Sequence, residues 1–365
     1  MLRPKIGLDW DDVTAPFNSI AIEMANQKYN INPPLILDDI DSWENKGRAS
    51  VIKEFYNDVR LYENQEVSKE NKENIQKLME IADVYFITAA YPEFMGVRAK
   101  QILEAFPGFP PENIILGNAK SLVQFDIVLD DAIHNILDSP ATYPVLMRKP
   151  WNRKMTGLLS VNNLHEFVVL VEQIINASLH KPVKINGPAV LALVGPSGSG
   201  KTAIANSLCR DIRFVNPKTY CTKQSYKHRY MPEEKFNKQK FIEQTQYAGV
   251  KYGTKAEDIQ AILDENHFAV MPLDICGAIA LKRHFSTSII YISKDKETLI
   301  RDILDEDYSI DEKTLRILSI DAEKRNREIC DFVIDNNDEQ AADKIFDLTV
   351  GDTGELESLF LMMDE

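Results

Sequence analysis

The sequence predicts two α/β domains, each a doubly wound parallel sheet with helices on both faces. A chain of 365 residues is too long for one ordinary core and suits two domains of roughly 150–200 residues. In each half, short apolar segments alternate with helical patterns, as is typical of a parallel sheet crossed by helices. Each half also opens with an apolar segment that runs directly into a loop suited to phosphate chemistry.

Five apolar segments in the first half are predicted to be strands of one sheet. They are Lys5–Leu8, Val84–Thr88, Asn113–Leu116, Phe125–Leu129 and Pro144–Met147. An apolar-periodic stretch at 164–175 predicts the closing helix of this domain. The stretch 15–81 contains helical patterns but no convincing strand, so we expect a helical cap inserted after the first strand.

Four apolar segments in the second half are predicted to be strands separated by helices. They are Ala189–Val194, Phe268–Leu273, Ser288–Ile292 and Phe332–Ile334. Between the halves, the segment from Ser178 to Pro188 has two prolines, one glycine and little periodicity, which indicates a linker. We therefore expect domains at 1–177 and 188–350, a linker at 178–187 and an acidic tail at 351–365.

The net charge of −14 is unevenly distributed along the chain. Residues 331–365 hold eleven acidic residues and one basic residue, which leaves the rest near neutral. This balance argues against nucleic acid or a membrane as the main partner, yet it allows a local basic pocket. The four cysteines have no metal-ligand spacing, and there is no signal-peptide pattern and no apolar run near the ~20 residues of a membrane span. We expect a cytoplasmic protein, with the oligomeric state left open.

Two pairs of carboxylates are expected at one edge of the first sheet. Asp9 and Asp11 follow the first strand two positions apart, so their side chains can converge. Asp130 and Asp131 follow another strand and reach the same carboxyl edge, where open parallel sheets bind ligands. These carboxylates would repel one another unless a cation compensates them, and oxygen ligands suit Mg²⁺. A solvated acidic turn is the alternative interpretation of the first pair.

A hydroxyl and an ammonium complete this set. Thr88 ends a third strand, and Lys120 precedes the second acidic pair by ten positions. The order D-x-D-x-V, then Thr, then Lys, then D-D resembles the haloacid dehalogenase-like phosphatase superfamily. The resemblance implies a Rossmannoid domain in which Asp9 attacks phosphorus to form an aspartyl-phosphate. Asp11 would protonate the leaving alkoxide and then activate water, while Thr88 and Lys120 neutralise the phosphoryl oxygens.

The resemblance also implies a ligand set for Mg²⁺. The ion would be held by Asp9, the backbone carbonyl of Asp11 and Asp130, with Asp131 nearby or in an outer position. Segments 17–18 and 150–152 are similar to the 5′(3′)-deoxyribonucleotidase branch of the superfamily. That branch usually has glycine where this chain has Asp12. The aromatic residues expected to stack on a nucleobase, or alternatively to pack in the core, are Phe17, Trp43 and Trp151.

The second half contains a complete G-x-x-x-x-G-K-[ST] pattern between a predicted strand and a predicted helix at 202–208. Backbone N–H groups of such a loop and the amino end of the helix form a cradle for phosphate. Lys201 would neutralise the β- and γ-phosphates of ATP, the expected phosphoryl donor, and Thr202 would bind Mg²⁺. The predicted ATP-binding residues are Gly195, Ser197, Gly198, Ser199, Gly200, Lys201 and Thr202.

Most of the sequence beyond this loop resembles guanylate kinase, a P-loop nucleoside-monophosphate kinase. The resemblance is carried by Phe241-Ile242-Glu243, Gly249, Tyr252-Gly253-Thr254, Leu273-Asp274-Ile275, Gly277, Arg316, Glu323 and 331–336. It implies that Tyr252 binds the acceptor phosphate and that Glu243 binds the base edge. Arg301 and Arg316 would close over the transferring phosphoryl group as a lid. The predicted monophosphate site is Lys223, Glu243, Tyr252 and Asp274.

Three departures from this family concern the acceptor. Lys223 replaces an arginine that would bind phosphate in a bidentate manner, and the stretch 224–229 is shortened. Cys276 stands where a base-reading aspartate is expected, and losing one hydrogen-bond partner weakens discrimination between bases. The acceptor is therefore open between a guanine nucleotide and another monophosphate. A basic run could supply the missing charge or form a solvated face: Lys218, Lys223, Lys227, Arg229, Lys235, Lys238 and Lys240.

Together these features predict a bifunctional nucleotide enzyme that acts on nucleoside monophosphates and ATP. Its first half would be a Mg²⁺-dependent 5′-nucleotidase and its second half an ATP-dependent nucleoside-monophosphate kinase. One alternative is an end-healing enzyme of the polynucleotide kinase-phosphatase type, against which the near-neutral body argues. The other is a phosphatase whose P-loop half senses nucleotides without catalysis.

Overall fold

The computed structural model describes residues 3–44, 46–177, 182–224, 228–247, 250–337 and 340–350. Contacts within the chain divide it into two units, Met1–Asn176 and Ala177–Glu365. Several predictions fall outside the described residues, namely the acidic tail at 351–365, the linker segment 178–181, Lys227 and Gly249. The domain boundaries given above therefore stay a prediction.

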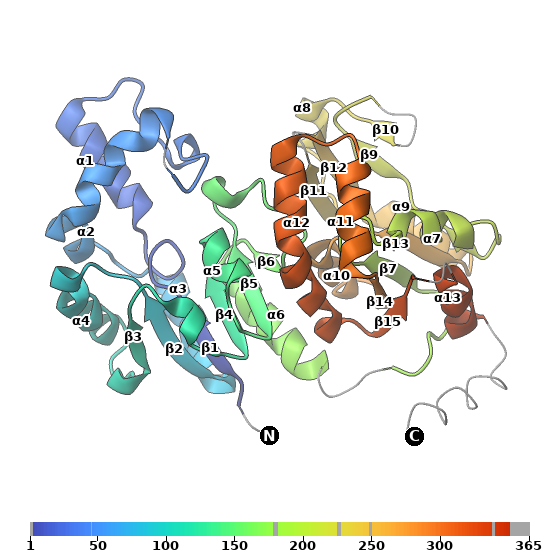
Figure 1. Cartoon of the computed structure of the whole chain (residues 1–365), viewed down its shortest axis with the longest axis horizontal. Coiled ribbons are helices and arrows are strands. Elements are labelled where there is room, and N and C mark those ends of the chain that lie inside the picture. The colour runs from blue at the N-terminus through green and yellow to red at the C-terminus, as the bar shows by residue number, and fades with distance from the viewer. Residues whose placement is uncertain are drawn as a thin grey trace. The chain divides into compact units, whose positions relative to one another are not determined.

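A six-stranded, fully parallel sheet forms the centre of the first unit (Figure 1). Its order is β3-β2-β1-β4-β5-β6. The strands are β1 (Lys5–Leu8), β2 (Asp83–Thr88), β3 (Ile114–Leu116), β4 (Ile127–Asp130), β5 (Tyr143–Met147) and β6 (Ser160–Val161). All five predicted strands are present, and only the two-residue β6 was not predicted, because it is too short to show a period. Since β1 lies between β2 and β4, the carboxyl ends of these three strands share one edge.

The helices of the first unit divide between the sheet and the cap. They are α1 (Asn18–Tyr29), η1 (Leu37–Asp39), η2 (Gly47–Asn57), α2 (Val59–Glu63), α3 (Lys69–Ile81), η3 (Pro92–Phe94), α4 (Met95–Ala105), η4 (Pro111–Asn113), η5 (Lys120–Leu122), α5 (Ile133–Leu137), η6 (Pro150–Asn152) and α6 (Leu164–Ala177). The cap has a core of its own, in which Ile22, Ile52 and Leu61 are buried together. By contrast, α3 contacts β2. The cap core therefore ends earlier than the predicted insertion, which ran to residue 81.

The second unit is centred on a five-stranded parallel sheet in the order β15-β14-β7-β13-β8. Its strands are β7 (Val190–Val194), β8 (Phe214–Val215), β13 (Phe268–Pro272), β14 (Thr287–Ser293) and β15 (Phe332–Asp335). Its helices are α7 (Lys201–Leu208), α8 (Glu233–Phe236), α9 (Ala256–Asp264), α10 (Ile275–Lys282), α11 (Lys296–Asp305), α12 (Ile310–Lys324), η7 (Arg325–Ile329) and α13 (Ala341–Thr349). All four predicted strands are present, and β8, two residues long, was not predicted.

Alternation along the strands explains why helices cover both faces of this sheet. Leu191 and Leu193 of β7 are buried in one cluster with residues of α7 and α13. Their neighbour Val190 is buried in another cluster with residues of α9 and α10. Successive strand residues point to opposite faces, so one strand contributes to two cores. The doubly wound architecture predicted for this half is confirmed.

A second, smaller sheet in this unit was not predicted. Its strands are β9 (Thr219–Cys221), β10 (Arg229–Tyr230), β11 (Glu243–Tyr247) and β12 (Val250–Thr254), in the order β10-β9-β12-β11. The β11–β12 and β9–β12 pairs are antiparallel. These segments are rich in tyrosine, threonine and glutamine and show no clear apolar alternation, so their pairing depends on tertiary context.

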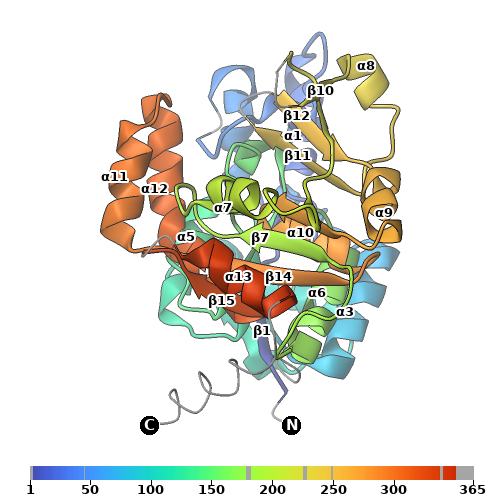
Figure 2. The same ribbon diagram turned by 90° about the vertical axis from the view of Figure 1, so that its right-hand side faces the viewer.

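Two helices of the second unit carry the predicted lid arginines. The helices α11 and α12 contact each other and lie side by side (Figure 2). Arg301 belongs to α11 and Arg316 to α12. No helix in the described part of the chain is both long and apolar enough to span a membrane.

Candidate functional site

Three buried carboxylates meet at the carboxyl edge of the first sheet. Asp9 follows β1, Asp130 ends β4, and Asp131 is the next residue. One oxygen from each of the three side chains lies within 4.8 Å of the other two. The backbone N–H of Asp9 donates to the carbonyl oxygen of Leu129 at 3.0 Å, which fixes the two loops against each other. The adjacency of β1 and β4 therefore assembles the predicted acidic cluster.

Lys120 neutralises only part of this cluster. Its Nζ lies 2.8 Å from Asp9 Oδ1 and 2.6 Å from Asp130 Oδ2. Burial alone would lower the pKa of Lys120, but the two carboxylates outweigh burial and raise it. Burial raises the pKa of Asp9 to about 7 although Lys120 opposes it, and burial also raises the pKa of Asp131 well above its usual value. Three buried carboxylates beside a single ammonium leave an excess of negative charge. A hard divalent cation that prefers oxygen ligands, such as Mg²⁺, would balance it.

Neighbouring side chains hold the second acidic pair in place. Asn135 Nδ2 donates to both oxygens of Asp130, at 3.1 and 3.0 Å. The Trp151 indole N–H donates to Asp131 Oδ2 at 2.9 Å, and Asn152 Nδ2 donates to the backbone oxygens of Asp131 and Met147. The Pro-Trp-Asn turn after β5 thus fixes Asp131, a contact that the sequence did not predict.

The Asp11 side chain is turned away from the cluster. Its carboxylate pairs with Arg98 and accepts a hydrogen bond from Gln65 at 2.7 Å. The structure therefore does not bring the Asp11 carboxylate to the predicted metal site, and its backbone carbonyl as a ligand stays a prediction. The predicted Thr88 ends β2, is fully buried, and donates its hydroxyl to the Ala89 carbonyl at 3.4 Å. Ala89, rather than Thr88, lines the pocket beside the cluster.

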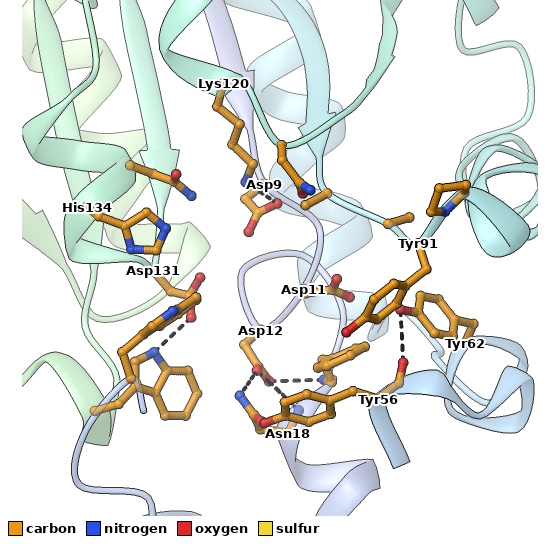
Figure 3. A pocket seen from close by; sticks show the side chains of 18 residues that line it. Asp9, Asp11, Asp12, Asn18, Tyr56, Tyr62, Tyr91, Lys120, Asp131 and His134 are labelled. Carbon is orange, nitrogen blue, oxygen red and sulfur yellow. Dashed lines mark hydrogen bonds and ion pairs between the residues drawn. The ribbon is translucent and has the colours of Figure 1, made fainter. Parts of the chain in front are cut away.

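An aromatic pocket of about 500 Å³ opens over the cluster (Figure 3). Asp9, Asp11, Lys120 and Asp131 line it. The aromatic residues that line it are Phe17, Trp43, Tyr56, Tyr62, Tyr91 and Trp151, most of them from the cap. The three aromatic residues expected from the sequence to stack on a base or pack in the core, Phe17, Trp43 and Trp151, are all among them. The pocket is large enough for a drug-sized ligand, and its polar floor and aromatic walls suit a nucleotide.

Asp12 stands where the 5′(3′)-deoxyribonucleotidase branch usually has glycine, and its side chain compensates for the difference. Its φ is 56°, in the left-handed region that favours glycine. Its carboxylate accepts hydrogen bonds from the backbone N–H groups of Phe17 and Asn18 and from Asn18 Nδ2 at 2.7 Å. These bonds satisfy the amino end of α1 and offset the backbone strain. Burial raises the pKa of Asp12 to about 6.

The glycine-rich loop of the second unit has the backbone that its sequence predicts. It connects β7 to α7, and three of its glycines have positive φ, namely Gly195 at 144°, Gly198 at 83° and Gly200 at 92°. A Cβ on Gly195 would lie 2.5 Å from the carbonyl oxygen of Ile292, so no other residue fits there. The buried Ser199 offers its carbonyl to Asn336 Nδ2 at 2.9 Å.

Lys201 lies inside this loop. Its Nζ donates to the carbonyl oxygens of Gly195 at 2.6 Å and Pro196 at 2.8 Å. Burial lowers the pKa of Lys201 to about 8, although the Glu323 carboxylate opposes it. Thr202, the first residue after Lys201, is exposed at the mouth of the loop. The loop thus keeps a cation where a phosphate chain would enter.

Two family models match the two halves of the chain. Residues 3–179 match the family model described as 5′ nucleotidase, deoxy (Pyrimidine), cytosolic type C protein, and residues 188–348 match that of guanylate kinase. The chain joins a nucleotidase domain to a guanylate kinase domain. These family matches support a phosphatase with a kinase-like domain.

Individual relatives match one half each. A 5′(3′)-deoxyribonucleotidase of Bacillus subtilis is 29% identical over 169 residues, which cover 45% of this chain and 96% of the relative. A guanylate kinase of Wolinella succinogenes is 28% identical over 176 residues, which cover 43% of this chain and 80% of the relative. Among solved structures, a guanylate kinase from Anaplasma phagocytophilum aligns with a TM-score of 0.35 and 19% identity, covering 50% of this chain and 89% of its own.

The kinase domain brings only part of the predicted monophosphate site together. Glu243 is buried and accepts from Thr254 Oγ1 at 3.4 Å, and its Cγ would lie 2.9 Å from a Cβ on Gly277. Asp274 accepts from the backbone N–H of Gly277 at 2.7 Å and so caps α10 next to Glu243. Tyr252 is paired across the small sheet with Cys221, two residues before the exposed Lys223.

The two predicted lid arginines differ. Arg316 Nη1 donates to Ser197 Oγ of the phosphate loop, and its guanidinium stacks 4.2 Å from the Tyr308 ring centroid. Arg301 is exposed on α11, and within the described ranges no hydrogen bond or ion pair joins it to the loop. The structure thus brings one of the two to the phosphate loop.

Several polar residues at the two sites were missed by sequence reasoning. Arg98, Gln65 and Asn135 contact the acidic residues of the nucleotidase domain, and Lys294 Nζ reaches the Gly198 carbonyl at 3.4 Å. None of them stands in a recognisable motif. Only Asn135, five residues after Asp130 on the following helix, lies close enough in sequence to have been proposed.

The buried Glu243 predicts a pH-dependent stability. Burial, helped by the charge of Asp274, raises the pKa of Glu243 from 4.5 to about 8. The folded state therefore favours the protonated form, so its stabilising contribution is complete below 4.5 and is lost as pH rises towards 8. We expect the unfolding temperature of the full chain to fall between about pH 5 and pH 8, and Glu243→Gln to reduce that fall. The exposed Glu234→Gln is the control, and an unchanged slope in Glu243→Gln would refute the assignment.

Proposed function

We propose that the nucleotidase domain hydrolyses nucleoside monophosphates and that the kinase domain transfers a phosphoryl group from ATP to a nucleoside monophosphate. One observation carries the first half of this proposal. Asp9, Asp130 and Asp131 converge beside Lys120, and Asp9, Asp131 and Lys120 line the floor of an aromatic pocket. A nucleophilic carboxylate, a lysine for the phosphate and flat walls for a base are then available in one volume.

The proposed hydrolysis proceeds in two displacements. An Asp9 carboxylate oxygen forms a bond to phosphorus while the ester P–O bond breaks, and Asp11 gives its proton to the departing alkoxide oxygen. Water then attacks the phosphorus of the aspartyl-phosphate, and Asp11 takes back a proton as phosphate leaves and Asp9 is restored. Lys120, already within 2.8 Å of Asp9, neutralises charge on the phosphoryl oxygens, whereas the buried Thr88 hydroxyl would reach them only by giving up its bond to the Ala89 carbonyl.

Mg²⁺ is the proposed ion of this cluster. Asp9 and Asp130 would hold it with the Asp11 carbonyl, and Asp131, fixed by Trp151, lies close enough to join them. When bound, the ion supplies positive charge that screens the carboxylates from the incoming phosphate. The chain itself orients the carboxylates, through Asn135 on Asp130 and Trp151 on Asp131.

The proposed substrates of the nucleotidase domain are deoxyribonucleoside monophosphates. Its Bacillus subtilis relative is named a 5′(3′)-deoxyribonucleotidase. Phe17, Trp43 and Trp151 line the pocket, where flat rings would stack on a base without reading its edge strongly. We therefore expect the domain to require a phosphomonoester but to accept several different bases.

The proposed kinase reaction uses the glycine-rich loop. Its backbone N–H groups, from Gly195 to Thr202, and Lys201 would hold the phosphates of ATP, with Thr202 binding Mg²⁺. Arg316 already contacts the loop through Ser197 and would close over the transferring group, joined by Arg301 when α11 and α12 move. The acceptor monophosphate would lie against Lys223, Tyr252, Glu243 and Asp274. In the part of the chain that the structure describes, no specific contact favours nucleic acid ends over mononucleotides.

A substrate panel tests both halves at once. The full chain is incubated with ribo- and deoxyribonucleoside monophosphates, with and without ATP, in Mg²⁺ or in excess EDTA. We expect phosphate release from deoxyribonucleotides in Mg²⁺, at least about 100-fold slower release in EDTA, and ADP formation that depends on both ATP and an acceptor. Faster release from a 3′-phosphorylated oligonucleotide would instead favour an end-healing enzyme. ATP binding without transfer to any acceptor would favour a nucleotide sensor.

A further inference from the structure

A completely buried arginine contacts Asp11, the proposed acid-base residue of the nucleotidase domain. The Arg98 side chain on α4 is 0% exposed. Its Nη2 lies 2.8 Å from Oδ1 and 3.0 Å from Oδ2 of Asp11. Gln65, which is also buried, donates from Nε2 to the same Oδ1 at 2.7 Å. Both oxygens of the Asp11 carboxylate are therefore held from one side.

The surroundings of Arg98 make a purely structural role costly. Its guanidinium carbon lies 5.8 Å from the ring centroid of Trp10 and 5.3 Å from that of Tyr62. Within the described ranges, Nε and Nη1 have no hydrogen-bond partner, and Asp11 is the one acidic residue in an ion pair with Arg98. Burying a cation with unsatisfied N–H groups destabilises a fold, and an apolar residue of similar size would fill this volume better. An arginine at this position is therefore explained by its ion pair with Asp11 rather than by packing.

The contacts with Arg98 and Gln65 also set the orientation of the Asp11 carboxylate. The backbone of its loop is fixed separately, since Thr14 Oγ1 donates to the Asp9 carbonyl at 2.8 Å and Asp11 bridges to Ala15. The side chain remains partly exposed to the pocket, at 23%. Its direction is therefore set by Arg98 and Gln65 rather than by its own loop.

We propose that Arg98 is a positioning residue that holds the Asp11 carboxylate at the distance and orientation needed for proton transfer to the leaving oxygen. The inference rests on the proposed function, in which Asp9 is the nucleophile and Asp11 the acid. Arg98 lies outside the pocket lining, so it acts through Asp11 rather than on substrate. Gln65 supports the same carboxylate from the segment that follows the cap.

Leaving-group dependence tests this role. The quantity kcat/KM reports the steps up to departure of the alcohol, which a nucleotide cannot complete without an acid but an activated aryl phosphate can. For Arg98→Met we expect kcat/KM to fall about 100-fold with a deoxyribonucleoside monophosphate and less than about 5-fold with p-nitrophenyl phosphate. Arg98→Lys, which keeps the charge, should shift the ratio in the same direction by less. Equal losses on both substrates would overturn the proposal.

A double-mutant comparison separates positioning from general damage. Asp11→Asn should show the same substrate selectivity, and adding Arg98→Met to it should cause little further loss, because the two act as one unit. Ile102→Ala, which empties a fully buried site on the same helix, is the structural control and should lower the unfolding temperature without changing the ratio. If Arg98→Met is not folded by thermal unfolding, Arg98→Lys decides, and an unchanged ratio there overturns the proposal.

Failure of the proposed function would give a different result from failure of the Arg98 inference. Wild type would then lack phosphatase activity on both esters, or Asp9→Asn would retain it. Failure of the Arg98 inference requires an active wild type that depends on Asp9, together with an unaltered substrate ratio or losses that add to those of Asp11→Asn.

Discussion

Asp9→Asn is expected to abolish phosphate release from nucleoside monophosphates, by at least about 10⁴-fold, and to leave ATP-dependent transfer unchanged. The amide has nearly the same size as the carboxylate, but it cannot act as the nucleophile that forms an acyl phosphate. Phosphate released from a deoxyribonucleoside monophosphate in Mg²⁺ measures the effect. Asp41→Asn, at an exposed position of the cap, is the matched control and should keep full activity.

The same variant has an expected effect on stability that checks its fold. Burial raises the pKa of Asp9 to about 7, and the charges of Asp130 and Asp11 add to the effect of burial. Removing one carboxylate from an overcrowded acidic cluster relieves repulsion, although it also removes an ion pair with Lys120. We expect the unfolding temperature of Asp9→Asn to be equal to that of wild type or higher. Retained phosphate release in a folded Asp9→Asn would eliminate Asp9 as the nucleophile.

Lys201→Ala is expected to lower phosphoryl transfer from ATP about 10²- to 10³-fold while leaving phosphate release unchanged. Lys201 is the cation inside the glycine-rich loop, and burial lowers its pKa to about 8 because it disfavours the charged form. The negative charge of a polyphosphate would favour the charged form. ADP formation in the presence of an acceptor monophosphate measures the loss.

Two further variants make this result interpretable. Lys201 also donates to the carbonyls of Gly195 and Pro196, so alanine could loosen the loop itself. Lys201→Met keeps most of the side-chain volume and should show the same loss, whereas the exposed Lys238→Ala should show none. Full transfer activity in a folded Lys201→Met would contradict the role of the loop in catalysis.

The fold and the phosphate loops could be predicted because their signals are local. Val190–Val194 is a continuous apolar run followed at once by the glycine pattern, and Lys5–Leu8 is followed at once by Asp9. Knowing that parallel strands share one carboxyl edge was enough to bring Asp130 to Asp9, whereas Lys120 was included for its spacing before the acidic pair and the resemblance to the phosphatase pattern. The strand-edge inferences needed only the order of short segments.

The partners of these residues could not be predicted because they come from distant parts of the chain. Gln65 and Arg98 reach Asp11 across 54 and 87 positions of sequence, and nothing in their own neighbourhood marks them. The small sheet that carries Tyr252 was missed for a related reason. Its strands are polar and gain their stability from pairing, which propensity does not reveal.

The central claim is that one chain carries two independent sites with opposite phosphate chemistry. Its most direct test measures phosphate release and ATP-dependent transfer side by side in wild type, Asp9→Asn and Lys201→Ala. We predict a reciprocal pattern, in which Asp9→Asn loses only release and Lys201→Ala loses only transfer. Loss of both activities in either folded variant would contradict the claim.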